Sequence, residues 1–331
     1  MKFRTAAASL AFLATCVTAS PTPTVERDAA GTLEKRASIT DACDIGYCTQ
    51  NGGTKGGAGG TTTTVSSLAQ LTAAAGGNSA AVIVVKGSIS GSAQVRVGSN
   101  KSIIGAAGSS ITGVGFYIKD QSNVIMRNLK ISKVIASNGD AIGIQKSTNV
   151  WVDHCDLSSD MDHDKDFYDG LLDVTHASDW VTISNTYLHD HWKTSLVGHS
   201  DSNSKEDTGH LHVTYANNHW SNINSRAPSF RFGTGHIFNN FFNKVSTGIN
   251  TRMDAQLLVE SSVFESCGEK AIFSADSDQT GYAVVSDVAL GGSRNTAPAG
   301  SIKDVPYAYK LLGSGGVKNS VVVGAGQTLG F

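Results

Sequence analysis

The chain has 331 residues, of which 40% are hydrophobic and 16% are charged, and it contains 36 glycines but only 5 prolines. This composition is typical of a globular protein and excludes a collagen-like or intrinsically disordered chain. The 26 Lys and Arg residues nearly balance the 28 Asp and Glu residues, so we expect no broad basic surface for nucleic acid or an anionic membrane.

The start of the chain has the features of segments that are removed during secretion. A basic start, an apolar stretch and small residues predict a signal peptide over residues 1–19. Residues 20–36 are polar and end in the dibasic pair Lys35-Arg36, which predicts a propeptide. The apolar stretch is too short to span a bilayer, and no comparable run follows it. We therefore expect a secreted, extracellular protein with a single catalytic domain at 37–331.

Four cysteines remain in the predicted mature protein, in a compartment where disulfides persist. Four cysteines allow three complete pairings, among which the sequence does not choose. Cys43 and Cys48 could close a small loop, whereas Cys155 and Cys267 lie in apolar, strand-like contexts that suit a buried free thiol as well as a disulfide. Asn100 begins a motif for N-glycosylation.

The first predicted elements are a short helix at residues 65–75 and a strand at residues 81–85. From about residue 120 to residue 265, strand-like segments recur every 22 to 32 residues. Six small residues mark this repeat, and we call them the anchors: Asn128, Cys155, Thr186, Asn218, Asn240 and Ser262. An apolar residue stands three places before each anchor, and another stands two places after each anchor except Asn128.

A repeat of about 22 residues, built from strands and small polar turn residues, fits one coil of a solenoid. We predict an all-β protein, a right-handed single-stranded parallel β-helix, with a β-sandwich as the alternative. Stacked from coil to coil, the anchors would hydrogen-bond the buried backbone of the turns. The segment from Pro306 onward is predicted to cap the solenoid.

Three acidic residues are candidates for a metal site. Asp169 and Asp173 flank an apolar pair, and Asp140 precedes an apolar stretch one repeat earlier, so the three would lie side by side on a solenoid. Clustered carboxylates repel each other unless a hard cation is present, and ligand sets made only of oxygen favour Ca²⁺. Solvated surface acids and the paired carboxylates of a glycoside hydrolase are the alternatives.

Basic residues are sparse, and four of them fall on loops or strand ends of successive repeats: Lys193, Arg226, Arg231 and Arg252. Beside a calcium site, such side chains would form a groove that matches a polyanion with regularly spaced carboxylates. For any single arginine, a surface salt bridge is the alternative.

Together these features resemble the extracellular pectate lyase family, polysaccharide lyase family 1, whose members are parallel β-helix enzymes that cleave polygalacturonate by β-elimination. The resemblance covers residues 52–264. It rests on three motifs that occur in order: Val150-Trp-Val-Asp-His154, Asp169-x-x-x-Asp173 and Arg226-x-Pro228-x-x-Arg231-x-Gly233.

The resemblance implies roles for individual residues. It implies that Arg226 is the base that removes the proton from carbon 5 of the sugar, and that Asn138 replaces an acid found in some relatives, which would weaken calcium binding before substrate arrives. The implied calcium ligands are Asp140, Asp169 and Asp173. The residues implied to hold substrate carboxylates or to support the base are Lys193, Arg231 and Arg252.

We therefore expect a monomeric, calcium-dependent enzyme that cleaves (1→4)-α-D-galacturonan to oligosaccharides with 4-deoxy-α-D-galact-4-enuronosyl non-reducing ends. An arginine base implies faster turnover at alkaline pH, because a guanidinium in water keeps its proton up to about pH 12. One alternative is a pectin lyase that acts on methylated pectin without calcium. The other is a non-catalytic polysaccharide-binding β-helix, which would leave the acids and Arg226 without a role.

Overall fold

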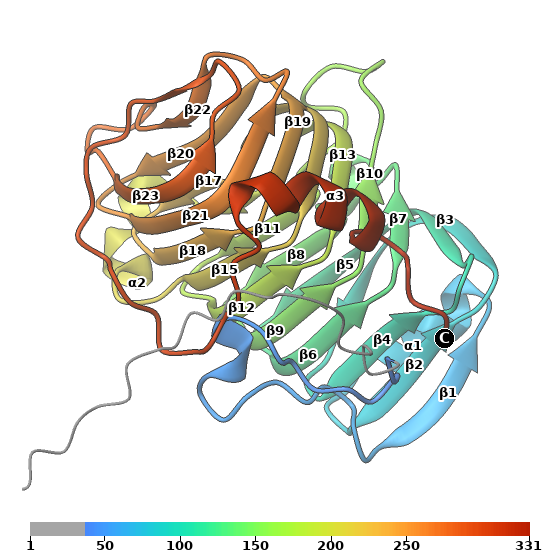
Figure 1. Cartoon of the computed structure of the whole chain (residues 1–331). Helices are drawn as coiled ribbons and strands as arrows, with labels where there is room; N and C mark the ends of the chain where they lie inside the picture. The colour runs from blue at the N-terminus through green and yellow to red at the C-terminus, as the bar shows by residue number, and fades with distance from the viewer. Residues whose placement is uncertain (1–36) are drawn as a thin grey trace, which may run out of the picture.

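The computed structural model describes residues 37–331, whose strands wind around a common axis so that each coil lies beside the next (Figure 1). All 24 strands belong to one hydrogen-bonded network, and the ladders between them are parallel. This confirms the predicted parallel β-helix and excludes the β-sandwich. The predicted signal peptide and propeptide, residues 1–19 and 20–36, lie outside the described residues.

The strands form three faces, because most coils contribute one strand to each face. The first face consists of β1 (Thr61–Val65), β2 (Ala81–Val85), β4 (Lys101–Gly105), β6 (Ser122–Arg127), β9 (Thr148–Asp153), β12 (Asp179–Ser184), β15 (His212–Ala216), β18 (Thr234–Phe238), β21 (Gln256–Glu265) and β23 (Tyr282–Ala289). The second face consists of β3 (Ser88–Val97), β5 (Ser110–Lys119), β7 (Lys130–Ser132), β10 (Asp156–Ser158), β13 (Tyr187–Lys193), β16 (His219–Ser225) and β19 (Phe241–Val245), and it is continued by β21. The third face begins with the second halves of β3 and β5 and continues with β8 (Ile142–Gln145), β11 (Leu172–Thr175), β14 (Leu196–Val197), β17 (Ser229–Arg231), β20 (Thr247–Arg252), β22 (Lys270–Phe273) and β24 (Arg294–Asn295).

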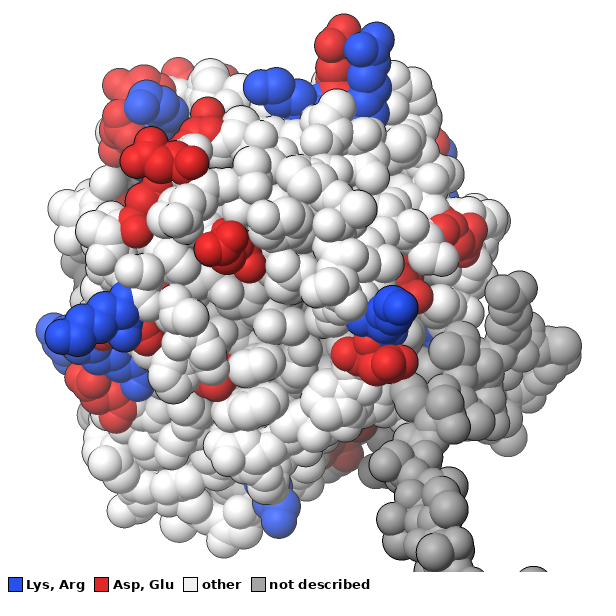
Figure 2. All heavy atoms as spheres, turned by 90° about the vertical axis from the view of Figure 1, so that its left-hand side faces the viewer, with Lys and Arg blue, Asp and Glu red and all other residues white. Residues whose placement is uncertain are grey.

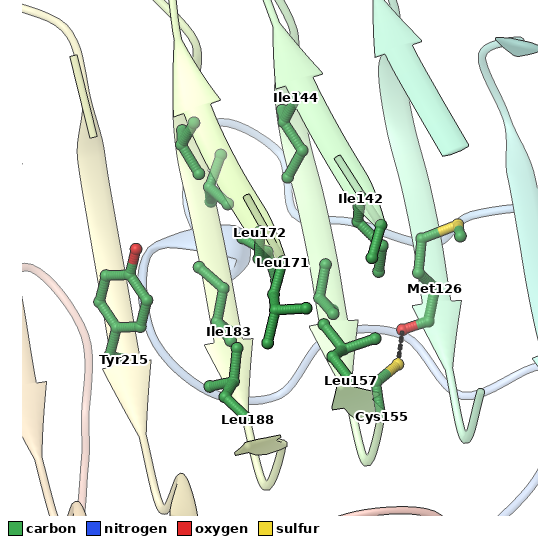
Figure 3. Packing of buried hydrophobic residues seen from close by; sticks show 14 of the residues in the cluster. Met126, Ile142, Ile144, Cys155, Leu157, Leu171, Leu172, Ile183, Leu188 and Tyr215 are labelled. Atoms are coloured by element: carbon green, nitrogen blue, oxygen red, sulfur yellow. Dashed lines mark hydrogen bonds between the residues drawn. The ribbon is translucent and has the colours of Figure 1, made fainter. Parts of the chain in front are cut away.

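The interior is a continuous stack of buried apolar side chains from all three faces. Figure 3 shows Leu157, Ile183 and Leu188 from neighbouring coils lying close together in this stack. The positions two places after the later anchors form a column of buried rings, in which Trp220 stacks on Phe242 at 5.7 Å and Phe242 stacks on Phe264 at 4.3 Å between ring centroids. Equivalent positions in successive coils are therefore in direct contact, as the repeat predicts.

A ladder of small polar side chains runs through the bends between the first and second faces. The backbone N–H of Thr186 donates to Asn218 Oδ1 at 2.9 Å, and the N–H of Asn218 donates to Asn240 Oδ1 at 3.3 Å. The N–H of Asn240 donates to Ser262 Oγ at 3.2 Å. These buried backbone groups are thus paired with the next coil, which confirms the predicted role of the anchors.

The first anchor was placed one residue out of register. Ile131 on β7 lies opposite Leu157 on β10, so the residue equivalent to the Cys155 anchor is Leu129 and not Asn128. This correction also removes the one exception in the apolar pattern, because the position two places after Leu129 is the buried Ile131. The exception appeared because a shift of one residue moves every side chain of a strand to the opposite face of the sheet.

The C-terminal segment runs along the outside of the β-helix, so the prediction that it caps the solenoid is wrong. Helix α3 (Ser314–Gly324) packs Val317 and Val321 against Phe241 on the outside of the second face (Figure 1). Beyond α3, Leu329 exchanges two backbone-to-side-chain hydrogen bonds of 2.9 Å with Asn128. Asn128 therefore fixes the C-terminal segment to the β-helix, and its Nδ2 also donates to the carbonyl oxygen of Gly105 in the preceding coil at 2.8 Å.

The N-terminal end of the β-helix is covered by α1 (Leu68–Ala75), which lies within the predicted helix and buries Leu71 and Ala75 in the core. The side chain of Ser67 accepts a hydrogen bond from the N–H of Gln70 and so caps the helix. The remaining helical segments are short: η1 (Tyr47–Thr49), η2 (Ala136–Asn138), η3 (Asp201–Asn203) and α2 (Ser204–Asp207). None of the helices within residues 37–331 is long and apolar enough to cross a lipid bilayer.

The structure distinguishes among the possible cysteine pairings. Cys43 and Cys48 form a disulfide, and Cys155 and Cys267 are free thiols. Cys155 lies in the interior, where its thiol contacts the carbonyl oxygen of Met126 (Figure 3). Burial raises the pKa of Cys155 to about 12, so this thiol is unreactive at neutral pH.

Asn100 lies in a left-handed bend with a φ of 59°. Its Nδ2, the atom to which a glycan would attach, donates to the carbonyl oxygen of Asn78 at 3.0 Å. The hydroxyl of Ser102 in the same motif is buried and accepts from the N–H of Gly57 at 2.9 Å. Glycosylation of Asn100 stays a prediction.

Replacing Asn240 by Leu should destabilise the fold by about 3 kcal/mol or more, because several buried polar groups would lose their partners at once. Its Oδ1 accepts from the N–H of Asn218 and from the indole N–H of Trp220, and its Nδ2 donates to two backbone carbonyls at 2.8 Å. Urea unfolding followed by circular dichroism measures the effect. The exposed Asn319 on α3 offers a matched control, and Asn319→Leu should change stability by less than about 0.5 kcal/mol. Equal stability of the two variants would contradict the ladder's contribution.

Candidate functional site

The predicted acids and the predicted base gather on the outside of the third face. Asp173 lies on β11, while Asp140 and Asp169 lie in the bends that precede β8 and β11. Arg226 lies in the bend before β17, where its φ of 60° is left-handed. These four side chains line one open cavity of about 390 Å³, which we call the acidic cavity.

Two of the three carboxylates are held by backbone hydrogen bonds. Asp140 Oδ1 accepts from the N–H of Gly170 at 2.9 Å, and Asp173 Oδ1 accepts from the N–H of Leu196 at 2.9 Å. Both donors belong to the next bend or strand of the solenoid, so coil stacking sets the positions of these acids. Asp169 Oδ1 lies 3.6 Å from Lys193 Nζ.

Electrostatics in the acidic cavity disfavour three charged carboxylates without a cation. Burial raises the pKa of Asp140 well above its usual range, and the negative charges of Asp173 and Asp169 raise it further. Burial also raises the pKa of Asp173, although the positive charge of Arg226 opposes this shift. A divalent cation among these oxygens would replace the repulsion by attraction, so the chemistry of the donor set fits a hard metal ion.

Glycines next to the acids leave room for their carboxylates. A Cβ atom on Gly170 would lie 2.5 Å from Asp173 Oδ1 and 2.9 Å from Asp140 Oδ1. A Cβ atom on Gly143 would lie 2.9 Å from Asp140 Oδ2. Only a residue without a side chain lets both carboxylates face the same space, and this is a second feature that fits a cation site.

The acids do not form a closed metal cage. Within residues 37–331, no three His, Cys, Asp or Glu side chains are close enough together to hold a metal ion on their own. The amide of Asn138 does not add a ligand, because its Nδ2 donates to Ser92 Oγ at 2.9 Å and to the carbonyl oxygen of Gly113. A cation bound here would therefore keep coordination positions for water or for substrate oxygens.

His191 positions Asp169, and the sequence analysis missed this role. Its Nε2 donates to the carbonyl oxygen of Asp169 at 2.6 Å, and its Nδ1 accepts from the hydroxyl of Ser159 at 2.9 Å. Burial lowers the pKa of His191 to about 4, so the ring is neutral. Alternation from the buried Leu188 would point His191 outward, but the left-handed Asp190, with a φ of 50°, breaks the alternation along β13, so the sequence carries no signal for the burial of His191.

Arg226 connects the acidic cavity with a second one, which we call the basic cavity. Arg226, Arg252 and Lys270 line the basic cavity together with Ser229 and Asn250. Among residues 37–331, the guanidinium of Arg226 has no hydrogen bond or ion pair with another side chain. This half-buried guanidinium lines both cavities and is therefore available to bind a ligand.

Acidic side chains hold the other predicted basic residues in position. Lys193 Nζ lies 3.1 Å from Asp166 Oδ1, beside the acidic cavity. The guanidinium of Arg231 donates to the carboxylate of Asp201 and to the carbonyl oxygen of Gly198. The same carboxylate lies 3.4 Å from Arg252 Nη2.

Asp201 therefore couples Arg231 and Arg252. Burial lowers the pKa of Arg252, and the positive charge of Arg231 lowers it further, so the carboxylate between them relieves their repulsion. Asp201 lies on η3, in the long connection between β14 and β15, and nothing in the repeat marks it. The sequence analysis missed it because its position depends on the path of that connection.

The motif around Asp153 lies apart from these cavities, at the bend between the first and second faces. Its carboxylate accepts from Arg127 Nε at 2.8 Å, from His154 Nδ1 at 2.7 Å and from the hydroxyl of Ser184 at 2.7 Å. Burial alone would raise the pKa of Asp153, but His154 and Arg127 outweigh burial and hold it below its usual range. These buried contacts give the motif a structural role.

Known proteins resemble this chain over nearly its whole length. A family model described as pectate lyase matches residues 18–328. A pectate lyase B from Colletotrichum gloeosporioides is 65% identical over 313 residues, which cover 94% of this chain and 93% of the relative. A probable pectate lyase B from Aspergillus flavus is 61% identical over 321 residues, which cover 96% of this chain and 98% of the relative.

Two solved structures support the fold. The crystal structure of a pectate lyase from Bacillus sp. N165 in complex with trigalacturonate matches with a TM-score of 0.79 and 30% identity, covering 86% of this chain and 98% of that one. A pectate lyase structure from Xanthomonas campestris matches with a TM-score of 0.75 and 25% identity, covering 87% of this chain and 98% of that one.

Replacing Gly170 by Ala should weaken binding of a divalent cation by about tenfold, because the new methyl group would displace the carboxylates of Asp140 and Asp173. Calorimetric titration with Ca²⁺ measures the affinity. Gly315 on α3 has open space around it, so Gly315→Ala is a control that should bind Ca²⁺ like the unmodified protein. Unchanged Ca²⁺ affinity in Gly170→Ala would exclude this cavity as the cation site.

Proposed function

Because the chain is an enzyme of the pectate lyase family, we propose that it cleaves (1→4)-α-D-galacturonan by calcium-dependent β-elimination. The products would be oligosaccharides with 4-deoxy-α-D-galact-4-enuronosyl non-reducing ends. One observation carries the proposal: the guanidinium of Arg226 forms no hydrogen bond or ion pair with the side chains of residues 37–331, and it lines both the acidic and the basic cavity. A sugar that bridges the two cavities would lie against this guanidinium.

The elimination requires one proton to be taken and one glycosidic bond to break. Arg226 removes the proton from carbon 5, the electron pair of that C–H bond forms the double bond between carbons 4 and 5, and the bond from carbon 4 to the glycosidic oxygen breaks. The leaving oxygen takes up a proton from water, and Arg226 returns the proton it has taken to the hydroxide that this leaves. Asp140, Asp169 and Asp173 would hold Ca²⁺, which would supply positive charge to the substrate carboxylate next to carbon 5 and so make the hydrogen on that carbon more acidic.

The remaining basic residues would orient the sugar acids. Lys193 lies beside Asp169 at the edge of the acidic cavity, so its ammonium can hold a carboxylate that also faces the cation site. Arg252 lines the basic cavity, and Arg231 packs beside it through Asp201. Two arginines tied by one carboxylate retain net positive charge, which suits the binding of an anionic sugar.

The acids of the cavity argue against the two alternatives. A pectin lyase that acts on methylated polymer binds neutral esters and would have no use for three carboxylates around one space. A binding protein without activity would leave Arg226 without a role. The related Bacillus enzyme was crystallised with trigalacturonate, which supports an acidic oligosaccharide as the ligand of this groove.

We also propose that the enzyme is secreted and acts as a monomer outside the cell. The basic and apolar start of the chain and the dibasic pair at Lys35-Arg36 support secretion. The disulfide between Cys43 and Cys48 is compatible with an oxidising compartment. Partners other than polygalacturonate, such as nucleic acid or a membrane, are not part of the proposal.

Ultraviolet absorbance of the unsaturated uronide tests the proposed reaction. With polygalacturonate and added Ca²⁺, absorbance should rise steadily, and an excess of chelator should stop the rise because the acids would lose their cation. Absence of an unsaturated product with Ca²⁺ present would reject the proposal. Faster elimination on methylated pectin, unaffected by chelator, would support the pectin lyase alternative.

Replacing Arg226 by Ala should lower kcat about 100-fold or more, which is the usual effect of removing a general base. The rate of the unmodified enzyme should rise toward alkaline pH, because a guanidinium acts as a base only after losing its proton, and the residual rate of the variant should lack this rise. Arg294→Ala removes an exposed arginine on β24 and serves as a control for charge. Circular dichroism checks folding, and near-normal turnover of Arg226→Ala would exclude it as the base.

A further inference from the structure

The third face carries another group of positive charges on the N-terminal side of the acidic cavity. A small cavity there is lined by Arg96 on β3, by Tyr117 on β5 and by Lys119 at the end of β5. Tyr117 also lines the acidic cavity, so the two cavities adjoin. We call the pair formed by Arg96 and Lys119 the distal basic site.

Strand register places the distal basic site in line with the catalytic groove. Arg96 pairs with Tyr117, Tyr117 pairs with Gly143, and Gly143 pairs with Asp173. Neighbouring strands are about 4.8 Å apart, so Arg96 lies about 14 Å along the axis from Asp173. In Figure 1 this line runs across β3, β5, β8 and β11 toward β17 and β22. A polymer that follows the axis through the acidic cavity would pass over Arg96.

The side chains of the distal basic site are open to an anion. Arg96 and Lys119 are exposed, and neither has an acidic partner within 4.0 Å among residues 37–331. The guanidinium of Arg96 lies over the ring of Tyr117, 5.5 Å from its centroid. The hydroxyl of Tyr117 in turn donates to the side chain of Gln145, so the ring and the guanidinium over it are held in place.

A buried ammonium without an acidic partner lies next to a residue that lines this cavity. Lys101 is 1% exposed, and its Nζ donates to the carbonyl oxygens of Gly77, Ser79 and Ser99 at 2.6 to 3.1 Å. Gly77 also lines the cavity. No carboxylate within residues 37–331 forms an ion pair with Lys101, and a buried charge without a counter-ion favours an anion nearby.

The opposite end of the groove repeats this arrangement. In the basic cavity, Lys270 lies over the ring of Phe273, 5.3 Å from its centroid. Phe273 and Tyr117 occupy equivalent positions on the third face, because β22, β20, β17 and β14 continue the row that contains Asp173. A cation over an aromatic ring therefore lies on each side of the acids.

We propose that the distal basic site is a substrate subsite, which binds carboxylates of a galacturonan chain that extends past the acidic cavity toward the N-terminal end of the β-helix. The proposal rests on the proposed function, since it assumes that the groove binds polygalacturonate. Regularly spaced carboxylates are the chemistry that this line of charges fits. A short oligomer confined to the acidic and basic cavities would not reach Arg96.

The double variant Arg96→Ala/Lys119→Ala tests this subsite through substrate length. The ratio of kcat/KM for polygalacturonate to kcat/KM for trigalacturonate should fall about three- to tenfold, since each exposed charge pair contributes modestly. Lys86→Ala removes one exposed lysine that lines none of the three cavities, and it should leave the ratio unchanged. The proposal would be overturned if the ratio for the double variant stays within twofold of the ratio for the unmodified enzyme. This includes the case in which the variant loses activity equally on both substrates.

A binding measurement separates failure of the subsite from failure of the proposed reaction. In the Arg226→Ala background, affinity for hexagalacturonate should fall by a similar factor when Arg96→Ala and Lys119→Ala are added, and it should depend less on salt concentration. Undiminished affinity would overturn the subsite even if the unmodified enzyme forms unsaturated product. Conversely, an enzyme that forms no product but loses hexagalacturonate affinity in this variant would contradict only the proposed reaction.

Discussion

In-register stacking of parallel coils is the constraint on which the functional face depends. Neighbouring strands are about 4.8 Å apart, so residues that are 20 to 30 positions apart in the sequence lie next to each other on successive coils. Asp140 reaches the backbone of Gly170, and Asp173 reaches that of Leu196, because each bond joins one coil to the next. The same stacking satisfies the buried bends through the anchors, so the interior ladder and the outer groove are two consequences of one register.

The pattern of charge along the third face follows from this geometry. Acids are concentrated in the middle, where burial and mutual repulsion raise the pKa values of Asp140 and Asp173. Positive groups lie on both sides, with Arg252 and Lys270 in the basic cavity and Arg96 at the other end. On the face drawn in Figure 2, acidic and basic side chains lie in small separate groups, and along the third face a protein with little net charge thus presents a locally ordered series of charges.

The sequence correctly predicts the role of a residue where that role depends on the repeat. The later anchors, the ring column of Trp220 and Phe242 and the shared cavity of the three acids all follow from counting along the chain. The prediction is wrong by one residue at Asn128, which has the residue type of an anchor but whose side chain binds the C-terminal segment. The prediction is also wrong for residues 306 onward, because a segment that packs on the outside of the strands has no periodic pattern of its own.

What the sequence by itself determined is the solenoid, its approximate register and the residue types that converge on the groove, because periodic apolar and small polar positions are local properties of the chain. Only the tertiary structure decided the partners of those residues: Asp201 between two arginines, His191 behind Asp169, and the line from Arg96 to Asp173. These contacts join a loop to a strand or one coil to another, and their distances depend on the three-dimensional path of connections whose length and course no repeat specifies.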